Sequence, residues 1–299
     1  MRYVLLGGRG ILGSGFRTSL ARRGVDVHLV RPPWSAPEEV PGHLRAELIR
    51  LASAGGPTTV LWAAGVGHVG ASEDDLAAET AGLAAVGDAL RALPEPVAAG
   101  TTVVFASSGG ALYGGQGPQV VQEDTPPCPV APYGKEKLRQ EGLLREVAEQ
   151  TGARVVACRM SNVYGLAQGR LSARGLVSTA VRCTRLRQPM TVFVSPDTRR
   201  DYLLSSDAAE LALEAGAAAP QGFSTALVRE GRSRTVAEVL ALVGAVARRR
   251  VPATYAERPQ TRLQPRVLRF APLPPGAGRV RLTPMETGIA LMVRAPLAG

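Results

Sequence analysis

Short apolar runs alternate with helix-like segments along the first half of the chain. Apolar, β-favouring runs lie at 3–6, 26–30, 59–62, 103–107 and 154–158. Between them, apolar residues recur at helical spacing over 12–23, 46–54, 72–93 and 133–151. Strands that alternate with helices in this way are typical of a parallel sheet with helices on both faces. The pattern therefore predicts an α/β fold.

After residue 165 the alternation weakens and the segments become shorter. Helical spacing returns at 176–186, 207–215, 235–248 and 284–293, and a strand-like run lies at 191–194. Residues 251–279 are rich in proline and arginine. We predict a larger lobe of residues 1–165, to which residues 200–216 return, and a smaller C-terminal substrate lobe of residues 166–199 and 217–299.

A glycine-rich turn follows the first predicted strand and opens the first predicted helix. It reads Gly7-Gly8-Arg9-Gly10-Ile11-Leu12-Gly13. In that place, glycines allow a tight turn and a close backbone approach to a pyrophosphate, which the N-terminus of the helix attracts. The context predicts a dinucleotide-binding, Rossmann-type fold with a doubly wound parallel sheet.

The second predicted strand ends at Arg31. An acidic residue at that position accepts hydrogen bonds from the ribose of NAD, whereas an arginine can bind a 2′-phosphate. We therefore predict NADP(H) as the cofactor. An exposed arginine without such a role, in a chain rich in arginine, is the alternative.

Tyr133 and Lys137 form the clearest candidate for chemistry. They stand at positions i and i+4 of a predicted helix, so both side chains lie on one face. Lys135 and Lys137 are the only lysines in the sequence. A neighbouring ammonium favours the phenolate and lowers the tyrosine pKa from about 10. A tyrosine adjusted in this way can exchange a proton with a carbinol oxygen while a nicotinamide carries the hydride.

Composition narrows the possible partners. The 299-residue chain has a formal net charge of +10. Its densest basic run, at 248–250, has no interleaved aromatic residues, unlike a surface for single-stranded nucleic acid. No apolar run of about 18 residues and no signal-peptide pattern occurs. The three cysteines and three histidines lack metal-ligand spacing. We expect a cytoplasmic protein without metal, nucleic-acid or membrane partners.

The order of these motifs resembles the extended short-chain dehydrogenase/reductase (NAD-dependent epimerase/dehydratase) family. The glycine turn comes first, then a segment from Ser107 to Gly114, then the Tyr133/Lys137 pair. Three more segments are similar to family motifs: Trp62-Ala63-Ala64-Gly65, Arg159-Met160-Ser161-Asn162-Val163-Tyr164-Gly165 and Arg199-Arg200-Asp201-Tyr202. The overall pattern most resembles the nucleotide-sugar 4-ketoreductases of deoxysugar biosynthesis.

The resemblance implies a role for each matched position. Tyr133 is expected to be the general acid/base, Lys137 its partner, and Ser107 or Ser108 the hydroxyl that assists them. The residues expected to bind the cofactor are Gly7, Gly10, Ile11, Leu12, Gly13, Arg31, His43, Leu44, Ala63, Ala64, Gly65, Tyr133, Lys137, Met160 and Ser161. The residues expected to bind the substrate are Asn162, Phe193, Arg200 and Arg258.

Four positions depart from the family pattern. The catalytic serine or threonine usually stands four residues before the tyrosine of the Tyr-Gly pair, where this chain has Gly109. His43 takes the place of an aspartate that contacts adenine, Glu79 stands where asparagine is common, and Leu227 replaces the asparagine of a later family segment. The departures leave the choice between Ser107 and Ser108 open.

The resemblance and Arg31 together favour a reductase. We expect NADPH-dependent reduction of a keto group on a dTDP-type 4-keto-6-deoxyhexose, with hydride from the nicotinamide and a proton from Tyr133, as in antibiotic biosynthesis. One alternative is an NAD-dependent nucleotide-sugar 4-epimerase or dehydratase. The other is a non-catalytic NADP-binding sensor, which the intact Tyr133/Lys137 pair disfavours.

The resemblance also implies a homodimer, formed through the helices at 72–93 and 133–151. The first of these helices carries an apolar stripe at helical spacing, which can face either a partner or the sheet. Its members are Leu76, Leu83, Val86, Leu90 and Leu93.

Overall fold

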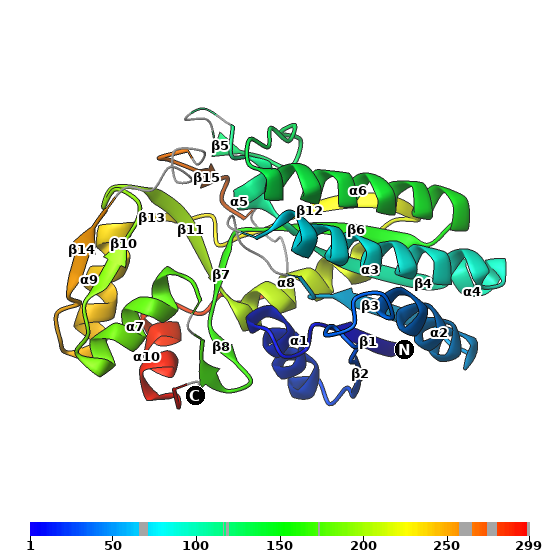
Figure 1. Ribbon diagram of the computed structural model, residues 1–299, viewed down its shortest axis with the longest axis horizontal. Coiled ribbons are helices and arrows are strands. Elements are labelled where there is room, and N and C mark those ends of the chain that lie inside the picture. Colours follow the sequence, from blue (N-terminus) through cyan, green and yellow to red (C-terminus); the bar gives the residue numbers. More distant parts are fainter. Residues whose placement is uncertain are drawn as a thin grey trace.

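Two lobes lie side by side in the computed structural model (Figure 1). The structure describes residues 1–65, 71–115, 117, 120–172, 174–256, 265–273 and 280–297. The larger lobe contains a parallel sheet with helices on both faces, and the smaller lobe contains short strands and three helices from the second half of the chain.

A six-stranded sheet with the order β12-β6-β4-β3-β1-β2 forms the centre of the larger lobe. Every neighbouring pair is parallel. The chain runs from β1 to β2 on one side and then crosses to β3 on the other side of β1, so the strand order reverses at β1. Ligands of such sheets bind at this reversal, beyond the carboxyl ends of the strands. The strands are β1 (Arg2–Leu6), β2 (Val27–Val30), β3 (Thr58–Trp62), β4 (Thr101–Ser108), β6 (Arg154–Met160) and β12 (Gly222–Val228).

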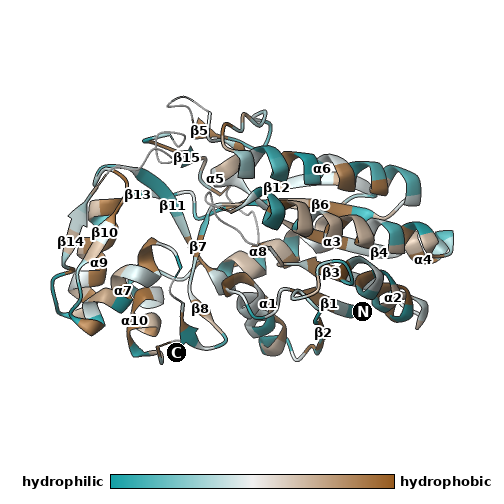
Figure 2. Cartoon of the chain, in the orientation of Figure 1, coloured by the Kyte–Doolittle hydropathy of each residue, from teal (hydrophilic) through white to brown (hydrophobic). Residues whose placement is uncertain are grey.

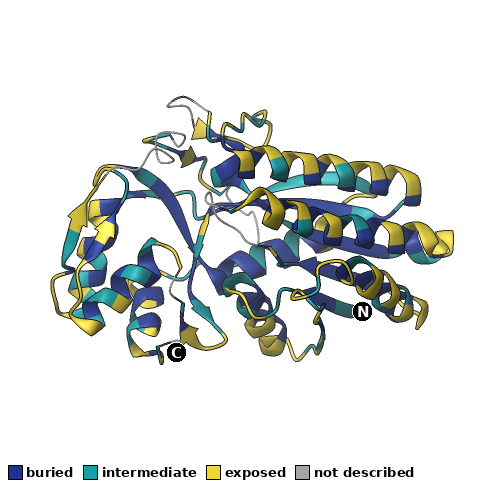
Figure 3. Cartoon of the chain, in the orientation of Figure 1, coloured by how far each residue is buried: buried dark blue, intermediate teal, exposed yellow. Residues whose placement is uncertain are grey.

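The alternation of side chains along each strand builds two core layers. Val4 and Leu6 of β1 pack in one hydrophobic cluster, and Leu5 packs in another. The first cluster is completed by α2 (Val40–Ser53), α3 (Glu73–Ala92) and α6 (Pro132–Thr151), and the second by α1 (Ile11–Arg22) and α8 (Ser205–Ala218). Figures 2 and 3 show the consequence, since these helices are apolar and buried on one side and hydrophilic and exposed on the other. The predicted doubly wound α/β fold is confirmed.

The smaller lobe has its own core, formed where α7 (Leu176–Leu186), α9 (Val236–Ala247) and α10 (Met285–Arg294) pack together. β11 (Arg199–Leu204) lies between β13 (Ser233–Thr235) and β7 (Asn162–Tyr164), and β10 (Met190–Val192) pairs with β14 (Ala253–Tyr255). A hairpin of β8 (Leu166–Ala167) and β9 (Arg170–Leu171) lies against α1. The remaining short elements are α4 (Glu95–Ala99), α5 (Gly109–Leu112), β5 (Val120–Val121) and β15 (Arg269–Phe270).

The predicted division of the chain needs two corrections. Residues 222–228 were assigned to the smaller lobe, but they form β12, which pairs with β6 in the main sheet. β12 is an edge strand and is half-buried over most of its length, so its sequence lacks the apolar run of a central strand. Residues 200–216 were expected to return to the larger lobe, but 200–204 belong to β11, which pairs with β7 and β13. Only the rest of that range packs on the larger lobe, within α8, where Gly15 allows α1 to approach the backbone of Ser205 closely.

The apolar stripe of α3 faces the larger lobe itself. Leu83, Val86, Leu90 and Leu93 are buried in the first core cluster, and Leu76 is buried beside Tyr133. The stripe therefore supplies no surface for a partner, and the expected dimer stays a prediction.

Candidate active site

The glycine turn after β1 touches the segment after β3. Gly7 has φ +81°, and a β-carbon there would lie 2.4 Å from the carbonyl carbon of Ala63. A β-carbon on Gly13 would lie 2.1 Å from the carbonyl oxygen of Gly7. These two positions therefore require glycine, whereas a β-carbon on Gly10 would meet its nearest neighbour, the Gly7 carbonyl oxygen, only at 3.5 Å. The geometry matches a backbone that a pyrophosphate can approach closely.

The N-terminus of α1 suits an anion. Its N-cap is Gly10, which has no side chain to bond the first amide groups, and its first turn holds no acidic residue. The amide groups of the first turn of a helix and the helix dipole both attract negative charge. Ile11 and Leu12 lie in this first turn, as predicted for residues next to a cofactor phosphate.

Two exposed arginines flank this turn. Arg31 follows β2, and Arg9 lies within the glycine turn itself. Arg9 was not among the residues predicted to bind the cofactor. His43 is exposed on the first turn of α2, while the side chain of Leu44 is fully buried in the core. Leu44 can thus contact a cofactor only through its backbone.

Tyr133 and Lys137 lie at the beginning of α6, and both are buried. Gly134 lets this helix approach α5, because a β-carbon there would lie 2.4 Å from the carbonyl oxygen of Ala111. The Lys137 Nζ lies 5.8 Å from the centre of the Tyr133 ring and donates a hydrogen bond to the Ala106 carbonyl oxygen at 3.3 Å. The predicted pair therefore shares one face of the helix and one buried site.

Lys137 has a partner that the sequence did not reveal. Its Nζ donates a hydrogen bond of 2.6 Å to Oε1 of Glu79 on α3, and the side chains of the pair are only 4% and 3% exposed. The sequence marked Glu79 as unusual, but 58 residues separate the partners along the chain. Only the packing of α3 against α6 brings them together.

The expected lowering of the tyrosine pKa is not observed. Burial raises the pKa of the Tyr133 phenol above its ordinary value, the positive charge of Lys137 opposes this increase, and the negative charge of Glu79 adds to it. The Ser108 side chain lowers the pKa of the same phenol through a hydrogen bond. The sequence correctly predicted that Lys137 lowers the pKa of Tyr133. It did not include burial and the charge of Glu79, which raise this pKa by more than Lys137 lowers it.

The structure distinguishes the two candidate serines. Ser107 Oγ donates a hydrogen bond of 2.6 Å to Glu141, which is itself paired with Arg159. Ser108 caps α5 by accepting a hydrogen bond from the Ala111 amide, and it interacts with the Tyr133 phenol. Ser108 is therefore the serine that faces the candidate chemistry.

Gly109, which replaces the usual catalytic hydroxyl, has little room for a side chain. A β-carbon there would lie 2.9 Å from the ring of Phe270. Phe270 belongs to β15, which pairs with β5, and its ring packs edge-on against Tyr113 at 6.2 Å between centres. A strand far along the sequence thus occupies the space beside Gly109.

Three of the four predicted substrate residues belong to the described part of the chain. Asn162 is exposed at the start of β7, and its Oδ1 lies 3.5 Å from where a β-carbon on Gly110 would be. Arg200 is buried and donates a hydrogen bond to the Arg199 carbonyl oxygen at 2.8 Å, and burial lowers the pKa of its guanidinium. Phe193 is half-buried, and Arg258 lies outside the described residues.

Met160 and Ser161 connect the sheet to the smaller lobe. Met160 is buried at the end of β6, and the Ser161 amide donates to the Val228 carbonyl oxygen at 2.8 Å. Asp201 lies nearby and accepts hydrogen bonds from the amides of Glu230 and Gly231. These bonds fix the backbone next to the expected nicotinamide site.

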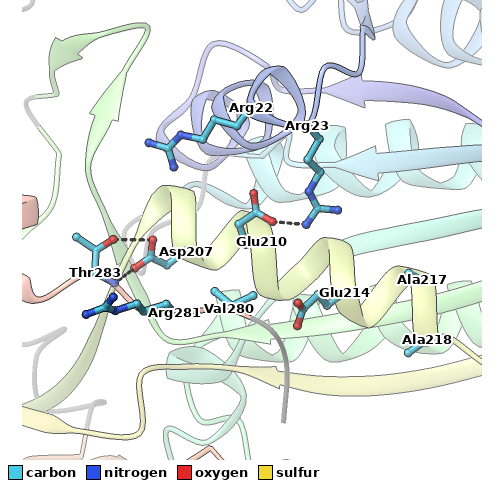
Figure 4. Close-up of a pocket in the computed structure, with 10 residues that line it drawn as sticks. All are labelled: Arg22, Arg23, Asp207, Glu210, Glu214, Ala217, Ala218, Val280, Arg281 and Thr283. Atoms are coloured by element: carbon cyan, nitrogen blue, oxygen red, sulfur yellow. Dashed lines mark hydrogen bonds and ion pairs between the residues drawn. The ribbon is translucent and has the colours of Figure 1, made fainter. Parts of the chain in front are cut away.

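A cavity of about 760 Å³ lies away from all of these residues. Figure 4 shows it between the end of α1, α8 and residues 280–283. Its walls carry an ion pair between Arg23 and Glu210 and hydrogen bonds from Thr283 to Asp207. The cavity includes neither the glycine turn nor Tyr133.

Within the described ranges, no three His, Cys, Asp or Glu side chains gather where they could hold a metal ion. In the same part of the chain, no helix is both long and apolar enough to cross a membrane.

A family model matches three quarters of the chain. The model of the NAD dependent epimerase/dehydratase family aligns with residues 3–224. The chain belongs to this family. The match covers the glycine turn, the Tyr133/Lys137 pair and the six strands of the main sheet, apart from the first residue of β1 and the last residues of β12.

Individual relatives are more distant. A UDP-glucose 4-epimerase of Azospirillum brasilense is 34% identical over 54% of this chain and 50% of its own length. A dTDP-4-dehydro-6-deoxyglucose reductase of Escherichia coli is 30% identical over 35% of this chain and 33% of its own length. The chain thus aligns with half or less of each of these curated relatives.

Solved structures share the whole fold. A UDP-glucose 4-epimerase of Thermus thermophilus in complex with NAD gives a TM-score of 0.75 at 24% identity and covers 98% of both chains. A UDP-glucose 4-epimerase of Thermotoga maritima with UDP-glucose gives 0.77 at 20% identity, covering 98% of this chain and 97% of that one. At these identities the likeness shows the fold alone.

Proposed function

We propose that this protein is a nucleotide-sugar enzyme that transfers hydride at C4 of the sugar, as a 4-epimerase or a related dehydratase does. The observation that carries the proposal is the buried Tyr133 phenol beside Ser108 and Lys137, which adjoins the glycine turn. A chain of contacts joins the two parts: Gly7 touches Ala63, and Gly65 touches Glu79, which binds Lys137. The epimerase relative with 34% identity supports the same reading.

The glycine turn fits a dinucleotide, because side chains at Gly7 and Gly13 would fill the space that the turn leaves. A nicotinamide bound there would supply the acceptor and donor of hydride. In its ionised form, Tyr133 would take the proton of the sugar hydroxyl as the carbonyl forms, and the resulting phenol would return a proton to the oxygen afterwards. The Ser108 hydroxyl would hold the same oxygen, and Lys137 would stabilise the phenolate.

Substrate binding would fall to residues on both lobes. Asn162 lies next to Gly110 of the larger lobe, so it can reach a sugar that contacts Tyr133. Arg200 carries a buried positive charge suited to a diphosphate. Such contacts would use the free energy of binding to hold the reacting carbon in the orientation that the reaction requires.

A 4-ketoreductase that uses NADPH, which the sequence placed first, is the second candidate. Three observations favour it. The E. coli reductase is a relative at 30% identity over part of the chain. Arg9 and Arg31 supply positive charge for a 2′-phosphate. The raised pKa of Tyr133 keeps the phenol protonated, as a donor to a ketone requires. A non-catalytic sensor gains nothing from the intact Tyr133/Lys137 pair.

The consumption of cofactor tests the proposal. An epimerase returns its hydride to the same sugar, so we expect interconversion of two nucleotide hexoses without net change in nicotinamide absorbance. Product formation is followed by chromatography with UDP-glucose and dTDP-glucose as substrates, and with dTDP-4-keto-6-deoxyglucose and NADPH as the second assay. Consumption of one NADPH per ketosugar would establish the reductase instead, and no turnover in either assay would contradict both candidates.

The choice between NAD and NADP depends on Arg31. We expect Arg31→Asp to weaken binding of NADPH by about 1.5–3 kcal/mol, because a charge-assisted contact to the 2′-phosphate is lost, while binding of NADH changes little. Dissociation constants from fluorescence titration measure both. Arg22→Asp, which removes the same charge at the far end of α1, serves as the control. Equal wild-type affinity for the two cofactors would rule out this role for Arg31.

A further inference from the structure

Glu79 lies at the junction of the cofactor segment and the candidate catalytic pair. Its Oε1 accepts the 2.6 Å hydrogen bond from Lys137, and its Oε2 lies 2.5 Å from where a β-carbon on Gly65 would be. Gly65 has φ +142° and lies three residues after Trp62, the last residue of β3. The carboxylate therefore contacts the loop on one side and the lysine on the other.

This contact limits what Lys137 can do. An ammonium has three N–H donors, and Lys137 gives one to Glu79 and one to the Ala106 carbonyl oxygen. Among the described residues these are the two hydrogen bonds of the ammonium, which leaves one donor for a ligand. The ring of Phe105 lies 4.8 Å from Nζ and closes another side. Lys137 is thus held in one position before any ligand arrives.

The pair also changes the charge beside Tyr133. The groups that face the phenol are Lys137 from α6, Glu79 from α3 and Ser108 from the end of β4, together with apolar Leu76 and Ala111. The positive charge of Lys137 and the negative charge of Glu79 cancel each other. Behind them, Glu141 and Arg159 form a second buried pair that is also neutral overall. Among the residues that the structure describes, the charges of these two pairs therefore sum to zero.

Stability alone does not explain a buried ion pair at this place. Replacing such pairs with apolar residues of similar volume is often neutral or stabilising, because the removal of two charges from water offsets their attraction. The position next to Tyr133 and Gly65 suggests a role in the site.

We propose that Glu79 is a positioning residue of the active site, which holds Lys137 against the cofactor segment and cancels its charge next to Tyr133. The inference rests on the proposed role of Tyr133 as acid/base. With the charge cancelled, Tyr133 stays a phenol over a wider pH range than it would beside an uncompensated lysine.

Replacing Glu79 with glutamine tests the charge. The variant keeps the shape but leaves the Lys137 charge uncompensated, which favours the phenolate. We expect the midpoint of Tyr133 ionisation to fall by about one pH unit. The ultraviolet absorbance of tyrosinate, measured as the difference between each protein and its Tyr133→Phe counterpart, reports this midpoint without substrate or cofactor. Circular dichroism at each pH confirms that the protein remains folded.

A matched control and a conservative variant complete the experiment. Asp88→Asn removes an exposed carboxylate from the same helix and should leave the midpoint unchanged. Glu79→Asp keeps the charge but shortens the side chain, so we expect an unchanged midpoint and a kcat lowered about tenfold, as for a misplaced catalytic group. It also tests the proposal if Glu79→Gln does not fold.

An unchanged or higher midpoint in Glu79→Gln, or wild-type kcat in Glu79→Asp, would overturn the proposal. The titration tests the role of Glu79, and the turnover assays test the proposed activity, so either claim can be contradicted without the other. Absence of hydride transfer would leave the midpoint shift valid, and an unchanged midpoint would leave the epimerase or reductase activity standing.

Discussion

Replacing Tyr133 with phenylalanine is expected to lower kcat by about 10²–10⁴-fold, the usual contribution of a positioned acid/base. The hydroxyl is the only group removed, and the ring remains packed against Leu76 and Ala111. Binding of the nicotinamide cofactor should change little, because the glycine turn that we expect to hold its phosphates lies on β1 and α1 rather than on α6. Steady-state turnover and fluorescence titration of the cofactor separate these two effects.

Tyr255→Phe provides the matched control for this loss. Tyr255 is 47% exposed in β14 of the smaller lobe, so the loss of its hydroxyl should leave turnover unchanged. Near-normal activity in Tyr133→Phe would remove Tyr133 from the catalytic assignment and with it the proposed acid/base chemistry.

The second large effect concerns stability. Glu141→Gln is expected to lower the free energy of unfolding by about 3–5 kcal/mol, because it leaves the buried Arg159 guanidinium without its counter-charge. The pair is 2.7 Å apart at its shortest contact, and its side chains are 8% and 3% exposed. Arg159 also donates to the Tyr113 hydroxyl at 2.8 Å, and Ser107 donates to Glu141, so the change disrupts a network.

Urea unfolding followed by circular dichroism measures this change. Glu149→Gln, an exposed substitution later in α6, should stay within about 0.5 kcal/mol of wild type. The double variant Glu141→Leu/Arg159→Met should recover part of the loss, since it removes both charges together. A loss below about 1 kcal/mol in Glu141→Gln would show that water or other groups satisfy Arg159.

Local pattern was sufficient for most of the fold. The parallel strands β1, β3, β4 and β6 are buried on both faces and read as continuous apolar runs, so they were predicted within a few residues. β12 was missed because an edge strand buries only part of its surface. The helix α2 begins at Val40 rather than at 46, because the prolines and glycine near its start masked the helical pattern.

The candidate site also has features that the local sequence predicted and features that depend on packing between distant segments. The glycine turn and the Tyr133/Lys137 pair are local motifs, since each depends on the spacing within one turn or one helix. The preference for Ser108 over Ser107 depends on Glu141, which belongs to another element. The tyrosine pKa was predicted in the wrong direction because burial and the charge of Glu79 are properties of the packed structure.

The sequence by itself determined the family, the α/β layering, the dinucleotide turn and the helix that carries Tyr133 and Lys137. These features follow from residues close together in the chain, whose periodicity and conformational limits act locally. The tertiary structure alone decided that Glu79 neutralises Lys137, that Phe270 fills the space beside Gly109 and that β12 joins the main sheet. Each of these joins distant segments, and burial and charge pairing between such segments have no signature in local sequence.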